Sequence, residues 1–148
     1  MTVQDTETDL TAALAADLRL LLGQLRRRLR EEVPPGDLTQ PQLTALLHLE
    51  RGEASTLTEL AQMEGVRSQS MGATVGSLLE LGLVEGEPHP NDRRRTTLRL
   101  SPAGHALIAQ RRAAREDWLQ RTLRVHLSAD EQADLARSVA LLRRLVRP

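Results

Sequence analysis

Three consecutive arginines, Arg93, Arg94 and Arg95, stand in a polar segment between two short apolar runs. A guanidinium group matches the oxygens of a phosphate or a carboxylate and pairs with them bidentately. Because three adjacent like charges repel one another, the cluster favours an anionic partner over a merely solvated turn. Asp92, directly before the cluster, is expected to orient one guanidinium through a salt bridge.

Small polar side chains form a second group, on the outer face of a helix predicted to begin at Arg67 or Ser68. A solvated helix normally carries Glu with Lys or Arg there, whereas this face offers hydroxyl, amide and methyl groups. Gln69 can pair bidentately with adenine, and Ser70 and Thr74 can contact bases or a thymine methyl. Ser68 suits a phosphate, because free amides at a helix N-terminus attract anions, and Arg67 suits either target. We therefore predict that this face reads base edges.

Patterns typical of catalysis or metal binding are missing from the sequence. None of the four histidines forms an i, i+4 pair or stands beside carboxylates at ligand spacing, so no metal site is predicted. There is no cysteine, no Ser-His-Asp grouping, no Gly-rich phosphate loop and no H-E-x-x-H motif. We therefore predict neither an enzymatic activity nor a cofactor.

Charge is balanced over the whole chain but uneven along it. Residues 1–92 hold 15 acidic side chains and 7 arginines, whereas residues 93–148 hold 5 and 13. A net charge of zero argues against nucleic-acid binding, but such asymmetry can mark an interaction surface. Trp118 is the only aromatic residue, which disfavours a single-strand binder that stacks bases on several rings.

Hydropathy gives no sign of a membrane protein or a secreted one. No apolar run approaches the about 20 residues that a membrane span requires. The N-terminal segment is acidic and polar, unlike a secretory signal. We expect a cytoplasmic protein.

The elements that position these residues begin with a long amphipathic helix, predicted from about Asp9 to Glu32. Its leucines recur every three or four residues and form one stripe, which comprises Leu10, Leu14, Leu18, Leu21, Leu25 and Leu29. Such a helix is about 36 Å long, more than one small domain covers, so we expect part of the stripe to meet a partner chain. A membrane-surface segment is disfavoured, because the stripe has no aromatic anchors and its flanks are acidic.

Three shorter helices are predicted next. The first begins at a capping box from Thr39 to Gln42 and ends near Gly52. A brief helix from about Thr58 to Glu64 ends at Gly65, and the third helix ends near Leu81. The third helix is expected to present residues 68–77 outward and to bury Met71, Val75, Leu78 and Leu79.

Two strands, Leu83 to Glu87 and Thr96 to Leu100, are predicted to flank the arginine-bearing loop as a hairpin. Ser101 and Pro102 then begin a further helix, and a capping box from Ser128 to Glu131 begins the last one. The last helix is expected to bury Leu135, Val139, Leu142 and either Leu145 or Val146.

With these elements in order, the chain resembles the MarR family of winged helix-turn-helix regulators over nearly its whole length. The most specific motif is Asn-Asp-Arg-Arg at residues 91–94, followed by an extended segment and Leu-Ser-Pro-Ala-Gly at residues 100–104. The family usually has Asp-Pro-x-Asp-Arg-Arg, a small residue and then Leu-Thr-x-x-Gly. Here His89 replaces the first aspartate, and Arg95 replaces the small residue and adds charge where phosphates are expected. Residues 66–71 also resemble the start of the family's recognition helix.

The resemblance implies a mainly α fold with a small β-hairpin wing. Residues 39–100 would form the winged helix-turn-helix DNA-binding region, and residues 1–38 and 101–148 a helical dimerisation domain. It also implies a homodimer that represses nearby genes from a palindromic operator in double-stranded DNA, with Arg94 probing a narrow minor groove. Many members release DNA when a small, often aromatic, acid binds between the two domains.

His48 and Trp118 lie on helices that would border this ligand cavity, although a lone tryptophan at helical spacing is more often a packed core residue. The competing hypothesis is a winged module that binds a ligand or a protein and has lost DNA binding. The zero net charge keeps that hypothesis open. A small helical enzyme is a third class, for which the sequence supplies no nucleophile or base.

Overall fold

The computed structural model describes residues 3–34 and 36–146, which form a mainly helical fold with one two-stranded hairpin. The expected fold class is therefore confirmed. The elements are α1 (Val3–Glu32), α2 (Gln40–Arg51), α3 (Leu57–Glu64), α4 (Ser68–Glu80), β1 (Val84–His89), β2 (Asp92–Leu100), α5 (Pro102–His126) and α6 (Ala129–Leu145).

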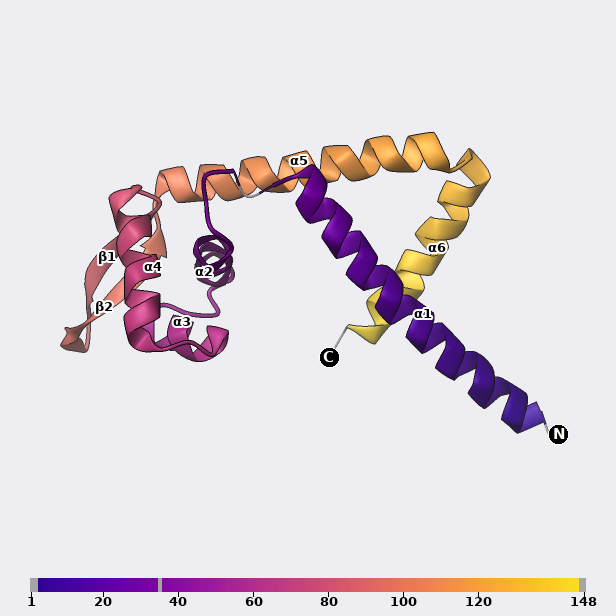
Figure 1. The fold of residues 1–148 in the computed structure, drawn as a ribbon, viewed down its shortest axis with the longest axis horizontal. Helices are drawn as coiled ribbons and strands as arrows, with labels where there is room; N and C mark the ends of the chain where they lie inside the picture. Colours follow the sequence, from indigo (N-terminus) through magenta and orange to yellow (C-terminus); the bar gives the residue numbers. More distant parts are fainter. Residues whose placement is uncertain (1–2, 35, 147–148) are drawn as a thin grey trace.

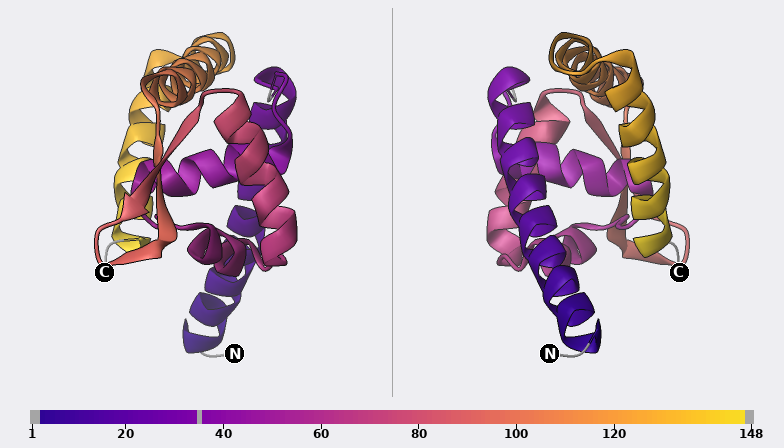
Figure 2. Two further views of the ribbon diagram at one scale, coloured as in Figure 1. Left: turned by 90° about the vertical axis from the view of Figure 1, so that its left-hand side faces the viewer. Right: turned by 90° about the vertical axis from the view of Figure 1, so that its right-hand side faces the viewer.

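Helix α5 runs along one edge of the molecule and joins its two parts (Figure 1). At one end of α5, helices α2, α3 and α4 and the hairpin form a compact lobe. Helix α1 extends from beside the middle of α5, and α6 turns back from its far end. The two outer helices cross in Figure 1, but Figure 2 shows them on different sides of the molecule, so they do not pack tightly along their length.

Capping side chains set where the helices begin. The predicted capping boxes at Thr39 and at Ser128 are both present. A further capping box joins Thr56 to Glu59, so α3 begins at Leu57 rather than at Thr58. In each box the side chains satisfy amides that would otherwise lack a partner in the first helical turn.

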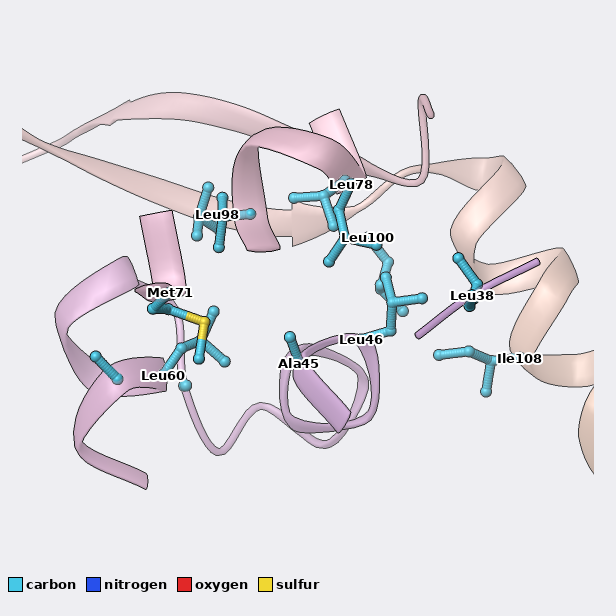
Figure 3. Close-up of a cluster of buried hydrophobic side chains, with 13 residues drawn as sticks. Leu38, Ala45, Leu46, Leu60, Met71, Leu78, Leu98, Leu100 and Ile108 are labelled. Atoms are coloured by element: carbon cyan, nitrogen blue, oxygen red, sulfur yellow. The ribbon is translucent and has the colours of Figure 1, made fainter. Parts of the chain in front are cut away.

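Aliphatic side chains from all elements of the lobe form its core (Figure 3). Leu46, Leu60 and Leu78 are fully buried, one from each of the three helices. Leu98 and Leu100 of β2 lie against them, and Ile108 of α5 closes the cluster. Burial of these side chains fixes α4 against α2 and α3, because hydrophobic burial favours one tight arrangement.

One expected core position on α4 is wrong. Met71, Val75 and Leu78 are buried, but Leu79 is 43% exposed. Successive helical residues differ by about 100° around the axis, so Leu79 points away from the stripe that Val75 and Leu78 complete.

The hairpin is longer than predicted, which corrects the placement of the three arginines. Val84 pairs with Leu100 and, at the tip, His89 pairs with Asp92. Thr96 pairs with Pro88, so residues 93–95 lie within strand β2 as a bulge without partners in β1, and not in the loop that the sequence predicts. The amide of Leu98 also donates to the carbonyl oxygen of Ser55 at 2.7 Å, which attaches the hairpin to the segment before α3.

The apolar stripes of α1 and α6 stay uncovered within one chain. Leu10 and Leu14 are 69% and 64% exposed, and no residue of α6 is buried. The expected burial of Leu135, Val139, Leu142 and either Leu145 or Val146 is thus wrong for a single chain, since no described element of that chain buries this face. Among the described residues, no helix is both long enough and apolar enough to cross a membrane.

Candidate nucleic-acid interface

The N-terminal half of α4 presents the polar face that the sequence predicts. Ser68, Gln69 and Ser70 are exposed, as is Arg67 at the N-cap position, where its side chain makes no capping hydrogen bond. Thr74 is half-buried, and its hydroxyl donates to the carbonyl oxygen of Ser70 at 3.3 Å. The structure therefore brings these five residues together on one outer surface.

Ser77 does not belong to this surface, although the sequence placed it there. Its hydroxyl donates to the carbonyl oxygen of Thr74 at 2.7 Å and accepts from the Gln42 amide at 2.8 Å. Gln42 is also the capping-box residue of α2, so this pair of hydrogen bonds fixes α4 relative to α2. Ser77 thus helps to fix the position of α4 on the side that faces α2 and does not belong to the exposed polar face.

The three arginines of β2 differ in their surroundings. Arg94 is exposed, and within the described residues its guanidinium has no ion-pair partner. The side chain of Arg93 lies outside what the structure describes. Asp92 was expected to orient one guanidinium, and among the described side chains it forms no ion pair with Arg94 or Arg95. Its Oδ1 accepts the backbone amide of Arg94 at 3.0 Å, which stabilises the hairpin tip.

Arg95 lies beside an acidic residue that the sequence analysis did not single out. Its Nη2 is 3.9 Å from Oε1 of Glu59. The other oxygen of Glu59 accepts the amides of Ser55 and Thr56 at 2.7 and 3.1 Å and the Ser55 hydroxyl at 3.1 Å. These hydrogen bonds, the Ser55 amide first, lower the pKa of Glu59. The Thr56-x-x-Glu59 spacing is a capping-box signature and could have been found in the sequence.

A groove of about 380 Å³ separates α4 from β2. Gly72 and Gly76 of α4 lie on one side, and Arg94 and Arg95 of β2 line the other. Helix α4 and the wing arginines therefore face one groove of the lobe, although the polar face formed by Arg67, Ser68, Gln69, Ser70 and Thr74 does not line it. Positive charge and small polar groups on one surface are typical of a duplex-binding site.

Known proteins share this arrangement. A family model described as MarR family matches residues 36–95, which span α2 to the arginines of β2. An HTH-type transcriptional regulator of Mycobacterium leprae is 36% identical, with 93% of this chain and 96% of that protein covered. The chain belongs to the MarR family. It is a transcriptional regulator with a DNA-binding helix-turn-helix, and the relatives are regulators rather than enzymes.

Two further comparisons support the fold and its extent. The multiple antibiotic resistance protein MarR of Escherichia coli is 30% identical over 74% of this chain and 76% of its own length. A crystal structure of a putative transcriptional regulator from Pseudomonas aeruginosa has a TM-score of 0.76 and 34% identity. It covers 100% of this chain and 99% of its own, so the outer helices belong to the shared fold.

His48 occupies a more specific environment than the sequence predicts. Its Nδ1 lies 2.6 Å from Glu53 Oε2 and its Nε2 lies 2.6 Å from Glu64 Oε1, so the ring stands between two carboxylates. Burial by itself lowers the pKa of His48, but the hydrogen bonds and charges of both glutamates outweigh it and raise the pKa above 6.5. No sequence signal predicts this arrangement, because folding and not ligand spacing brings Glu53 and Glu64 to the ring. In the described part of the chain, no group of three or more His, Cys, Asp or Glu residues is arranged to hold a metal ion.

A cleft of about 630 Å³ lies between α1, α2 and α5, and His48 is part of its wall. Trp118 lies half-buried further along α5 and does not line this cleft, so the structure does not bring the two predicted ligand residues together. The cleft also gathers Arg26, Arg30, Arg51 and Arg115, which sequence reasoning missed. No sequence signal joins them, because they come from three elements far apart in the chain.

Proposed function

We propose that this MarR-family regulator is a homodimeric repressor that binds a palindromic operator in double-stranded DNA. The observation that carries the proposal is the exposed polar face of α4 together with the exposed Arg94, which borders the groove along α4 and has no ion-pair partner among the described residues. An exposed helix with an amide and hydroxyls can enter a major groove, and an arginine on an adjoining strand can reach the next minor groove.

Each predicted DNA-binding residue has a proposed role in that complex. Gln69, Ser70 and Thr74 contact base edges, and Thr74 does so through its methyl group because its hydroxyl already has a partner. Arg67 and Ser68 contact phosphates at the N-terminus of α4. The wing arginines Arg93, Arg94 and Arg95 bind phosphates and the minor groove.

The dimer is proposed to form through residues 1–38 and 101–148, whereas residues 39–100 bind DNA. The leucine stripe of α1 and the apolar face of α6 support this division, because a single chain leaves both exposed. Large exposed apolar faces mark association surfaces. A twofold-symmetric dimer would place two α4 helices in major grooves about 34 Å apart, one helical turn of DNA.

We further propose that a small acid releases the repressor from DNA by binding in the cleft between α1, α2 and α5. The support is the position of this cleft between the two regions and the lining of its wall by His48. Any ligand there contacts both the dimerisation region and the first helix of the DNA-binding region, so it can bias their relative placement.

A mobility-shift titration on the DNA upstream of the protein's own gene, at two salt concentrations, tests the proposal. Random duplex of equal length is the control. We expect selective, salt-sensitive binding with one dimer for each palindrome. If neither the upstream region nor a site selected from a random pool binds more tightly than random duplex, the alternative of a winged module that has lost DNA binding is favoured.

A further inference from the structure

Three helices contribute arginines to the cleft, and no carboxylate of the described residues lines it. Arg26 and Arg30 come from α1, Arg51 is the last residue of α2, and Arg115 lies in the middle of α5. An adjoining hollow also has four arginines, but two glutamates line it as well. The whole chain has equal numbers of acidic and basic residues, so this lining is a strong local departure from the average.

The positive charges of this cleft are not neutralised within the chain. Among the described residues, Arg26, Arg30 and Arg115 have no ion-pair partner, and Arg51 reaches only Glu53 at 3.8 Å. Their neighbours on α1 behave differently, since Arg28 pairs with Glu32 at 2.8 Å. The cleft therefore keeps free guanidinium groups close to Arg27 and Arg28, which pair with glutamates of the same helix.

The proximity of these positively charged arginines is energetically unfavourable. Arg26 and Arg30 lie one helical turn apart, a spacing at which like charges destabilise a helix. The Nε of Arg115 is buried without a hydrogen-bond partner in the described structure. The pKa of the neighbouring Arg111 is lowered by burial and then by the charge of Arg115. A bound anion would remove these unfavourable interactions.

We propose that the cleft binds an anion with two or more acid groups, such as a tricarboxylate or a diphosphate. This names the ligand class of the proposed effector site, and it departs from the aromatic acids that the family resemblance implies. One carboxylate pairs bidentately with one guanidinium, so a monocarboxylate leaves most of the positive lining unmatched. The only aromatic side chain, Trp118, is outside the cleft and cannot stack on a ring. The volume of about 630 Å³ accommodates such a small ligand with its acid groups directed to several walls.

The cleft also has a direct connection to the helix-turn-helix. His48 in its wall is hydrogen-bonded to Glu64, the last residue of α3, and only three residues separate Glu64 from the start of α4. An anion that attracts the protonated His48 ring competes with Glu64 for it. Binding in the cleft can therefore shift the end of α3 and the start of α4.

Isothermal titration calorimetry on the full-length protein tests the ligand class. The probes are propane-1,2,3-tricarboxylate, pyrophosphate and benzoate, which separate a carboxylate source from a phosphate source and a polyanion from an aromatic monoacid. The test variant is Arg26→Gln with Arg30→Gln. The matched control is Arg27→Gln with Arg28→Gln, which removes the same charge from the same helix outside the cleft.

We expect the tricarboxylate or pyrophosphate to bind at least roughly ten-fold more tightly than benzoate. The test variant should bind that polyanion at least about ten-fold more weakly, while the control stays within about two-fold. Benzoate binding as tightly as both polyanions, equal weakening in the two variants, or no binding of any probe would each overturn the proposal. DNA binding of the anion-free protein is measured separately, so a failure of the proposed repressor function is distinguishable from a failure of this site.

Discussion

The carboxylate of Glu59 and the guanidinium of Arg95 lie 3.9 Å apart, between the first turn of α3 and strand β2. Both side chains are nearly half exposed, so the ion pair alone is weak, about 0–1 kcal/mol. Its significance comes from the other oxygen of Glu59, which accepts two backbone amides and a hydroxyl at residues 55 and 56. Because Ser55 in turn accepts the amide of Leu98, Glu59 connects the helix-turn-helix to the wing at two points.

Glu59→Gln should weaken DNA binding, although it removes a negative charge close to the proposed DNA surface. The amide side chain loses charge-assisted hydrogen bonds to the N-terminus of α3, at a cost of about 0.5–2 kcal/mol in stability. It also loses its attraction for Arg95, which loosens the wing. Fluorescence anisotropy with operator DNA measures the affinity, and Glu80→Gln on exposed α4 is the charge-matched control. Tighter binding by Glu59→Gln would show that Glu59 only competes with phosphates for Arg95.

The contribution of His48 to stability should decrease as the pH rises. Its folded pKa is raised above 6.5 because the protonated ring donates to Glu53 and to Glu64. The stabilisation is fully present below the unfolded pKa of about 6.5, while both glutamates stay ionised, and is lost as the pH rises through the raised pKa. Urea titrations near pH 6 and near pH 8.5 measure the free energy of unfolding of the wild type and of His48→Gln. The difference between the two proteins should be about 1 kcal/mol larger near pH 6 than near pH 8.5.

The control for this experiment is His105→Gln, since the His105 ring is exposed and has no ion-pair partner among the described residues. That variant should follow the wild type at both pH values. A difference between wild type and His48→Gln that is independent of pH would contradict the charged-ring geometry.

Arg94→Ala should weaken binding to operator and random DNA by similar factors. An unpaired guanidinium that meets phosphates contributes affinity without base information. The slope of log K against log salt should flatten by about 0.9 for each phosphate that the variant no longer neutralises. Anisotropy titrations over a salt series measure this slope. An unchanged slope, or weakening confined to the operator, would show that Arg94 does not bind phosphate.

Gln69→Ala should mainly relax base choice. The exposed amide of Gln69 can make two hydrogen bonds to adenine, and each good bidentate pair discriminates by about 1–3 kcal/mol. We therefore expect weaker binding to the operator with little change on random duplex, and a broader consensus after selection from a random pool. Equal weakening on both DNAs would count against a base-reading role.

Leu142→Glu should shift the dimer toward monomers. Leu142 is 37% exposed in a single chain and lies on the apolar face of α6. A buried leucine contributes about 1.5–3 kcal/mol, and a twofold interface contains it twice. Sedimentation velocity measures the change, and Leu81→Glu, at an equally apolar exposed site beside α4, is the control. A dimer of unchanged strength would exclude this face of α6 from the interface.

Local signals in the sequence determined most of the helical boundaries. Short-range chemistry explains this success, because the Thr39 and Ser128 caps act within one turn and Gly65 and Gly82 take left-handed conformations at φ 63° and 69°. The exposed positions of Ser68, Gln69 and Ser70 also follow from local helical periodicity. The wing motif at residues 91–95 indicated the family in the same way, through its local spacing.

Contacts between distant segments required the tertiary structure. The pairing of Arg95 with Glu59, the two glutamates around His48 and the hydrogen bond from Gln42 to Ser77 join residues from different elements. The four cleft arginines are another such set, spread from α1 to α5. Periodicity in the sequence indicates which face of a helix is apolar and which is polar. It does not indicate which other element packs against that face. Packing of the hydrophobic core decides that, and it places Arg95 beside Glu59 and brings the arginines of three helices to one cleft.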